Sequence, residues 1–441
     1  MGITKTAILP SNGRQLESRN DRFGDVASAL FPKSYSLIPG LAEFYELELA
    51  YLETHALKPA QLVKQGAYFM QIGGEYTDHF RMCSGAPVKT AEDSSERLKS
   101  FFARNIYRTG YASHGLFPYR GKFHPQMIRG LINILGLRPN DVVLDPMMGS
   151  GTTLIEASIM GIRSIGFDVS PFCSLMTKAK VAALRTNKED LGRSSSAFMA
   201  KLNASTRDAK SPLLDRDFVL DGIGRASQST REVVELAYLD AVGYHRRRTA
   251  TPFSKLAGEI FERYAGVIDK FQQASLNLGL PLAESRIVAG DARQLDLADA
   301  SVDGAIFSPP YSFAIDYVEN DAPQLEYLGV DTGSLREKMV GLRGKVLKDR
   351  VDLYFKDMQI VIAEVARVLK PRKHAAIIVG SNTRQLSNAL GVAEGEVIGI
   401  EQYFIDYAHA SGLSLRRLIE RPIHGLSNTM RQECILILQK N

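Results

Sequence analysis

Residues 142–153 read VVLDPMMGSGTT, and this segment carries most of the information on the architecture of the chain. The apolar run Val142–Asp145 ends in an acid and predicts a short buried strand. Gly149 and Gly151 predict a tight turn, because glycine lets the backbone bend sharply and approach a ligand closely. The following LIEASIMG has a helical period and is expected to end at Gly161.

A second strand and a second acid follow this helix. The segment SIGFD, residues 164–168, predicts a strand that ends at Asp168, 23 residues after Asp145. A strand, a glycine turn, a helix and a strand with a terminal acid form the core unit of a doubly wound α/β domain. The free N–H groups at the helix start favour an anionic group, and the acid can accept hydrogen bonds from ribose hydroxyls. The sequence therefore predicts a site for a nucleoside-bearing cofactor.

The residues of the turn narrow the choice of cofactor. A dinucleotide-binding fold favours GxGxxG, and the run here is GSGTTL, without the third glycine. A phosphate-binding P-loop requires a lysine after the glycines, and none is present. S-adenosylmethionine is the remaining option, although an ordinary turn between a strand and a helix would show the same glycines.

The motif Ser308-Pro309-Pro310-Tyr311 ends another predicted strand, GAIF. Prolines fix the backbone and have no N–H, so nearby carbonyl oxygens can face inward as acceptors. The serine and proline oxygens can accept the hydrogens of an exocyclic amine, and the adjacent aromatic ring can stack on a flipped base. Asp291 follows the strand SRIVAG, so it is expected at the carboxyl end of a neighbouring strand, where such ligands bind.

Together, DPMMGSGTT and SPPY resemble the bacterial DNA methyltransferases that modify cytosine N4 or adenine N6. The serine of SPPY is most similar to the cytosine-N4 branch. The resemblance covers roughly residues 107–172 and 285–439. It implies a doubly wound, Rossmann-like sheet of the S-adenosylmethionine-dependent methyltransferases, split by a helical insertion and preceded by an N-terminal extension.

The resemblance also implies the residues of the site. Lys122 and Phe123 match a Lys-Phe element that the family carries before the glycine turn, with a role in holding the methionine end of the cofactor. The cofactor-binding residues implied are Lys122, Phe123, Asp145, Pro146, Gly149, Ser150, Gly151, Thr152, Thr153, Asp168, Asp291 and Ala292. The catalytic residues implied are Ser308, Pro309, Pro310 and Tyr311. No metal is expected, because positioning and local electrostatics carry most of the rate in this chemistry.

We therefore expect a site-specific DNA methyltransferase that acts on the exocyclic amine of a flipped base in duplex DNA, with cytosine N4 as the target. Adenine N6 and an RNA base remain alternatives, because related motifs occur in methyltransferases of tRNA and rRNA. Methylation of a protein glutamine is a further alternative, although that family typically has Asn before the two prolines. A ring-carbon methyltransferase needs a cysteine nucleophile, and none of Cys83, Cys173 and Cys434 lies in such a motif.

The remaining sequence suggests how these parts are arranged. The expected division is an accessory region at 1–105, a cofactor-binding half at 106–185, a helical insertion at 186–285 and a catalytic half at 286–441. Within the first region, Leu41–Leu57 predicts one amphipathic helix, whereas the polar segment 11–25 is expected to be flexible. Target recognition is assigned either to the insertion or to residues 312–350.

Composition limits the class of protein. The 441 residues are 45% hydrophobic and 23% charged, as in ordinary globular proteins. Three cysteines cannot build a disulfide framework, and no apolar run reaches the roughly 18 residues that span a membrane. A net charge of +5 permits a nucleic-acid partner without requiring one. We expect a cytoplasmic protein without membrane contact, and its oligomeric state is left open.

Overall fold

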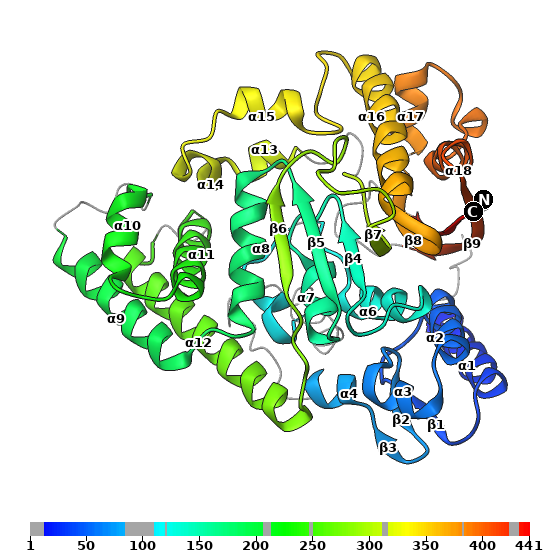
Figure 1. Cartoon of the computed structure of the whole chain (residues 1–441), viewed down its shortest axis with the longest axis horizontal. Helices are drawn as coiled ribbons and strands as arrows, with labels where there is room; N and C mark the ends of the chain where they lie inside the picture. The colour runs from blue at the N-terminus through cyan, green and yellow to red at the C-terminus, as the bar shows by residue number, and fades with distance from the viewer. Residues whose placement is uncertain are drawn as a thin grey trace, which may run out of the picture.

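A twisted, mostly parallel sheet forms the centre of the computed structural model (Figure 1). The structure describes residues 13–83, 110–119, 121–205, 213–246, 250–310, 316–381, 383–422 and 432–441. In this part of the chain the large sheet has seven strands in the order β6-β5-β4-β7-β8-β10-β9. The strands are β4 (Val142–Asp145), β5 (Arg163–Asp168), β6 (Ser285–Ala289), β7 (Val302–Phe307), β8 (Leu369–Ser381), β9 (Leu413–Pro422) and β10 (Gln432–Lys440).

The strand order creates a switch point beside β4. From β4 the chain adds β5 and β6 on one side, then returns to add β7 and β8 on the other, and all these neighbours pair in parallel. In a doubly wound sheet, ligands bind outside the carboxyl ends of the strands where the order reverses. The turn after β4, the acid at the end of β5 and the SPPY motif after β7 therefore meet at one edge.

Helices cover both faces of the sheet, which confirms the predicted doubly wound α/β class. Alternate residues of β4 point to opposite faces, since Val143 packs in a cluster with helix α6 and Leu144 packs in a cluster with α16 and α18. The helices around the sheet are α6 (Pro125–Ile134), α7 (Thr152–Ile159), α8 (Pro171–Ala183), α16 (Leu347–Val368), α17 (Thr383–Leu390) and α18 (Ile400–Ala410).

A closing hairpin completes the sheet, as the segments SLRRLIERP and CILILQK predict. The strands β9 and β10 pair antiparallel from Gln432 opposite Pro422 to Lys440 opposite Leu413. The strand β10 also pairs antiparallel with β8. Two antiparallel strands thus extend a parallel sheet at its edge, an arrangement common in large α/β sheets.

The first hundred residues differ from expectation in two places. The polar segment expected to be flexible lies from Gly13 onward in a helix, because Phe23 and Ala27, four residues apart, pack on the core. A three-stranded sheet also forms there, and its strands of two to four residues are too short to show alternation in sequence. The elements are α1 (Gly13–Leu30), β1 (Tyr35–Leu37), α2 (Phe44–Ala56), α3 (Pro59–Gln65), β2 (Phe69–Ile72), β3 (Glu75–Tyr76) and α4 (Asp78–Cys83).

The segment 186–285 is helical, in agreement with its period. Its helices are α9 (Lys188–Ala204), α10 (Arg216–Ile223), α11 (Gln228–His245) and α12 (Phe253–Leu278). They share one apolar cluster with α8 and with the short helices that follow the SPPY segment. These are α13 (Tyr317–Asn320), α14 (Ala322–Tyr327) and α15 (Thr332–Lys338). The short 3-10 helices are η1 (Ala112–Gly115) and η2 (Glu394–Glu396). Among the described helices, none is long and apolar enough to cross a bilayer.

Candidate active site

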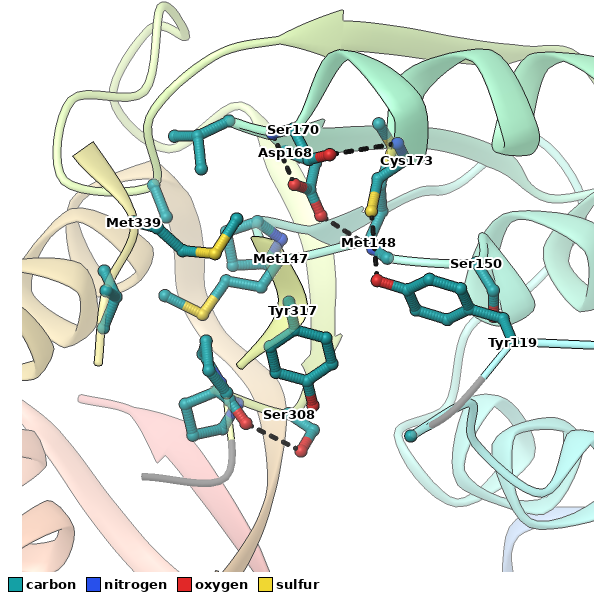
Figure 2. A pocket seen from close by; sticks show the side chains of 18 of the residues that line it. Tyr119, Met147, Met148, Ser150, Asp168, Ser170, Cys173, Ser308, Tyr317 and Met339 are labelled. Atoms are coloured by element: carbon teal, nitrogen blue, oxygen red, sulfur yellow. Dashed lines mark hydrogen bonds between the residues drawn. The ribbon is translucent and has the colours of Figure 1, made fainter. Parts of the chain in front are cut away.

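One cavity opens at the switch point of the sheet (Figure 2). Most of the residues implied by the sequence motifs line it. They are Lys122, Phe123, Pro146, Gly149, Ser150, Thr152, Asp168, Asp291, Ala292, Ser308, Pro309 and Pro310. Asp145, Gly151 and Thr153 do not line it, and Tyr311 lies outside the described residues. Segments far apart in sequence therefore meet in one hollow, as the fold predicts.

The glycine turn is held by backbone geometry. Gly149 and Gly151 have φ angles of +47° and +76°, in the left-handed region that glycine adopts without strain. A Cβ on Gly151 would lie 2.6 Å from Cγ2 of Thr177. The hydroxyl of Thr177 donates to the carbonyl oxygen of Gly149 at 2.9 Å. Glycine is thus required at position 151 for packing against α8, whereas Gly149 lines the cavity.

Asp145 supports the turn from behind. Its side chain is 1% exposed, and Oδ1 accepts the backbone N–H of Met147 at 3.2 Å. Burial raises the pKa of this carboxyl to about 7. Thr153 is also fully buried, in the first turn of α7. The turn is therefore supported from behind by Asp145, Gly151 and Thr153, and these residues do not line the cavity.

Asp168 lies at the end of β5 and faces the turn. Its Oδ2 accepts the N–H of Gly149 at 3.0 Å, and its Oδ1 accepts the N–H of Ser170 at 2.8 Å. Burial raises the pKa of Asp168 to about 6, although these two donors act to lower it. Each carboxylate oxygen can accept more than one hydrogen bond. Asp168 is thus oriented by the backbone and can still accept hydroxyl donors from the cavity, as expected for a ribose-binding acid.

Asp291 is tied to an arginine. Nη2 of Arg293 contacts Oδ2 of Asp291 at 2.6 Å, and Nε contacts Oδ1 at 3.0 Å. Burial acts to raise the pKa of Asp291, but the hydrogen bonds and charge of Arg293 lower it below its ordinary value. Arg293 also contacts Asp357 at 2.9 Å. The carboxylate of Asp291 is therefore a fixed charge in the wall, and the backbone at Ala292 continues that wall.

The loop that contains Lys122 is connected by hydrogen bonds to the buried carboxylate of Glu156 on α7. Glu156 is fully buried and accepts from the hydroxyl of Tyr111 at 2.6 Å and from Nε2 of His114 at 2.7 Å. It also contacts Nη1 of Arg129 at 3.3 Å. Nζ of Lys122 donates to the carbonyl oxygen of His114 at 3.0 Å, and burial lowers the pKa of this lysine to about 8. His114 therefore has a structural role, since it links the loop of Lys122 to Glu156.

The SPPY segment begins directly after the buried strand β7. Ser308 is partly buried, and its Oγ donates to the carbonyl oxygen of Pro309 at 3.2 Å. Pro309 and Pro310 border the cavity. A hydroxyl and a carbonyl oxygen are thus adjacent and face the same hollow as the glycine turn, which is the arrangement needed to accept two hydrogens from one amine.

Part of the cavity wall comes from Tyr119, which the sequence does not single out, and from the acidic stretch around Tyr317, whose acids the sequence predicts to face the protein or to bind base amines. Tyr119 and Tyr317 line the cavity with their rings stacked, 6.4 Å between centroids and 20° between planes. The acids near Tyr317 separate into different roles. Asp316 pairs with Arg336 at 2.6 Å, whereas Asp321 lines the cavity and accepts from the hydroxyl of Tyr119 at 3.3 Å. The proximity of this acidic stretch to SPPY was the available signal.

Two groups of basic residues, 246–248 and 343–350, are candidates for contact with nucleic-acid phosphates. Arg246 is exposed at the end of α11, and Arg247 and Arg248 lie outside the described residues. Within the second group Arg343 pairs with Asp357 at 2.6 Å, whereas Lys345 and Lys348 are exposed at the start of α16. In the described part of the chain, no group of three His, Cys, Asp or Glu side chains is placed to hold a metal ion.

Comparison with known proteins finds methyltransferases of DNA and, over shorter stretches, of tRNA. A family model described as DNA methylase matches residues 48–178. The type II methyltransferase M.MjaII of Methanocaldococcus jannaschii is 38% identical over 106 residues, which cover 24% of this chain and 19% of that protein. The type II methyltransferase M.BsoBI of Geobacillus stearothermophilus is 25% identical over 301 residues, 57% of this chain and 58% of that protein.

These matches confirm the resemblance to the amino-methyltransferases of DNA, and with it the expectation of S-adenosylmethionine as cofactor. They correct its extent, because the family match begins at residue 48 rather than near 107. The chain spans less than two thirds of the length of these relatives.

Among solved structures, the rRNA methyltransferase aviRa of Streptomyces viridochromogenes aligns with a TM-score of 0.34 at 12% identity, covering 74% of this chain and 88% of that one. The fold class therefore rests on the strand order of this chain.

Proposed function

We propose that this chain transfers a methyl group from S-adenosylmethionine to the exocyclic amine of a flipped base in duplex DNA, with cytosine N4 as the target. One observation carries the proposal. The glycine turn, Asp168 and the Ser308–Pro310 segment come from three parallel strands and line the same cavity. A cofactor held by the first two would lie within reach of an amine held by the third.

The residues that line the cavity support this cofactor. Asp168 would accept the ribose hydroxyls, and the wall at Asp291 and Ala292 would border the adenine. The start of α7 at Thr152 offers backbone N–H groups for the methionine carboxylate. Lys122 also lines the cavity, and its pKa, lowered by burial to about 8, leaves it mainly protonated at pH 7. When bound, the cofactor would supply a methyl group whose bond to the sulfonium sulfur breaks as the bond to the amine nitrogen forms. S-adenosylhomocysteine would be the leaving group, and the methylated nitrogen would release one proton to water.

The SPPY segment would activate the amine by orientation. The lone pair of an exocyclic amine is conjugated with the ring, so the nitrogen is a poor nucleophile. Ser308 and the carbonyl oxygen of Pro309 accept the two hydrogens and turn the lone pair out of the ring plane. The hydrogen bond between these two groups is replaced when the base enters. Orientation and fixed dipoles then account for the acceleration, without a covalent intermediate.

Serine at position 308 favours cytosine N4 over adenine N6, and this finer assignment rests on that residue. The same geometry would serve an adenine amine, so adenine N6 is the second candidate. The family match favours DNA over RNA as the substrate. Lys345 and Lys348 support a nucleic-acid substrate, DNA or RNA alike, because they follow Gly341, where a Cβ would lie 3.9 Å from Cβ of Pro310. Two exposed lysines a few residues from the catalytic segment can contact phosphates.

The test combines an acceptor assay with one matched pair of variants. Purified protein is incubated with labelled S-adenosylmethionine and either duplex DNA or total RNA, and the acceptor is digested to nucleosides for mass spectrometry. We expect N4-methylcytosine from DNA, and loss of the product in Ser308→Ala. Ser301→Ala, in the exposed turn before β7, is the control and should keep the activity. N6-methyladenine would replace the base assignment, and label in RNA alone would refute DNA as the substrate.

A further inference from the structure

Three carboxyl groups line the cavity, and the proposed function uses two of them. Asp168 is oriented by two backbone N–H groups, and Asp291 is tied to Arg293. The third, Asp321, is 7% exposed and comes from the junction between α13 and α14. A buried acid in a cavity is costly unless something favours its charged form. The roles of Asp168 and Asp291 therefore do not explain why a buried carboxyl group is present at position 321.

The position of Asp321 is fixed by its backbone and by one side chain. Its N–H donates to the carbonyl oxygen of Tyr317 at 3.0 Å, and its own carbonyl oxygen accepts from Leu325 at 2.9 Å. The hydroxyl of Tyr119 donates to its Oδ2 at 3.3 Å. Val318 and Leu325 on either side are buried in the apolar cluster of the helical insertion. The carboxyl is thus anchored on the wall that faces the sheet.

Tyr119 connects this carboxyl to the glycine turn. A Cβ on Gly149 would lie 3.9 Å from the ring of Tyr119, and the Tyr119 hydroxyl lies 3.4 Å from Sγ of Cys173 at the start of α8. Figure 2 shows the ring between Ser150 and Cys173, with its hydroxyl toward the cavity. Asp321 is therefore linked through Tyr119 to the same turn that Asp168 contacts.

The chemistry of the cofactor indicates what such an acid would contact. The methionine end of S-adenosylmethionine is a zwitterion, with a carboxylate and an ammonium group on one carbon atom. The N–H groups at the start of α7 and the charge of Lys122 suit the carboxylate. The ammonium group requires an acceptor nearby, and an ionised carboxylate is the strongest one available. We propose that Asp321 binds the ammonium group of the cofactor, an inference that rests on the cofactor assignment made above.

The electrostatics of the wall make this contact dependent on pH. Burial and the nearby charge of Asp168 raise the pKa of Asp321 to about 7, while the hydrogen bond from Tyr119 lowers it. The other ionisable groups coupled to this carboxyl are Tyr317 and Cys173, both neutral at this pH because burial raises their pKa. The charged form of Asp321 predominates above pH 7 and is lost as pH falls. A cation bound beside it favours the charged form, so cofactor affinity should decrease below pH 7.

The experiment compares two ligands that differ in the amino-acid end. S-adenosylhomocysteine carries the ammonium group, and 5′-methylthioadenosine lacks the whole amino-acid end. Dissociation constants are measured by calorimetry between pH 6 and pH 8.5 for the wild type and for Asp321→Asn. We expect the substitution to weaken S-adenosylhomocysteine at least about tenfold at pH 8, as for loss of a charged hydrogen bond, and to leave 5′-methylthioadenosine within about twofold. Binding of the second ligand also verifies that the variant is folded.

Two further variants sharpen the result. Asp316→Asn is the matched control, because Asp316 caps the same helix but pairs with Arg336, and both ligands should bind it as they bind the wild type. Tyr119→Phe keeps the ring and removes the donor, so the pKa of Asp321 should rise and the loss of S-adenosylhomocysteine affinity should begin at a higher pH.

The outcomes separate this inference from the proposed function. Equal weakening of both ligands, or unchanged binding of S-adenosylhomocysteine in Asp321→Asn, would overturn the ammonium contact. Unchanged cofactor binding with reduced methyl transfer would place Asp321 at the target base instead, and the proposed function would stand. A wild type that binds neither ligand would overturn the cofactor assignment itself and this inference with it.

Discussion

Replacing Glu156 by glutamine should destabilise the protein and loosen the loop that carries Lys122. This carboxylate on α7 is fully buried and lies in contact with Tyr111 and His114, from the segment around η1, and with Arg129 on α6. Glutamine has nearly the same shape but no charge. The substitution therefore leaves the guanidinium of Arg129, itself 2% exposed, without its buried counter-charge.

Two related quantities give the size of the effect on the free energy of unfolding. Removing one partner of a buried ion pair costs about 3–5 kcal/mol. Burial alone would raise the pKa of Glu156, but the hydrogen bond from His114 and the charge of Arg129 lower it from 4.5 to about 2. A shift of that size corresponds to about 3 kcal/mol in favour of the charged form in the folded state. Both routes predict a loss of about 3 kcal/mol or more in the free energy of unfolding at pH 7.

The measurement is urea unfolding of the wild type and Glu156→Gln, followed by circular dichroism. Glu48→Gln is the control, because Glu48 pairs with Arg417 at 2.6 Å but the two side chains are 31% and 47% exposed, and pairs at the surface contribute less than about 1 kcal/mol. Affinity for S-adenosylhomocysteine should also fall in Glu156→Gln, since His114 holds Lys122 through its carbonyl oxygen. Neither change is expected in the control.

The difference in unfolding free energy between the wild type and Glu156→Gln should depend on pH, and this dependence tests whether the charge of Glu156 is responsible. A carboxyl group whose folded pKa is lowered contributes stability above its unfolded pKa and loses it as pH falls toward the folded value. The difference between wild type and Glu156→Gln should therefore be full above about pH 4.5 and narrow below it. A difference under about 1 kcal/mol at pH 7 would refute the account of a buried charge that fastens the loop.

Three other substitutions test the turn, the catalytic segment and the DNA contact. Ser308→Ala should reduce single-turnover methyl transfer by about 10²–10³-fold, with DNA affinity retained in a gel-shift assay, because an acceptor at the reacting amine is lost. Gly151→Ala should cost about 2–5 kcal/mol in urea unfolding, since its Cβ would lie 2.6 Å from Thr177 at a φ of +76°. The double variant Lys345→Ala/Lys348→Ala should weaken DNA binding and reduce the salt slope by about 2, if both lysines contact phosphates; an unchanged slope would remove them from the interface.

Much of the fold could be predicted because its signals are local. The apolar strands Val142–Asp145 and Val302–Phe307, the glycine turn and the closing hairpin all have short, strong patterns. The small sheet of the first hundred residues has strands of two to four residues, and such segments show no period. Helix α1 is mostly polar, so only its packing through Phe23 and Ala27 distinguishes it from a flexible segment.

The wall opposite the sheet could not be predicted for a different reason. Asp321 and Tyr119 are 202 residues apart, and their contact depends on how α13 and α14 pack on the helical insertion. Nothing in the spacing of the acids near Tyr317 shows that one pairs with Arg336 while another enters the cavity. Such assignments require the tertiary structure, because side-chain environment rather than residue type separates the two aspartates.

The glycine-turn motif itself combines two kinds of residue that a sequence pattern cannot separate. Gly149, Ser150 and Thr152 border the cavity, whereas Asp145 and Gly151 face the interior and set the path of the backbone. Both kinds are required at fixed spacing, because a backbone N–H can point at a ligand only if buried groups hold the turn in place. Substitutions of the two kinds of residue should therefore have different effects on stability and on cofactor affinity. Those behind the wall should lower stability first, and those at the cavity should lower cofactor affinity while the protein remains folded.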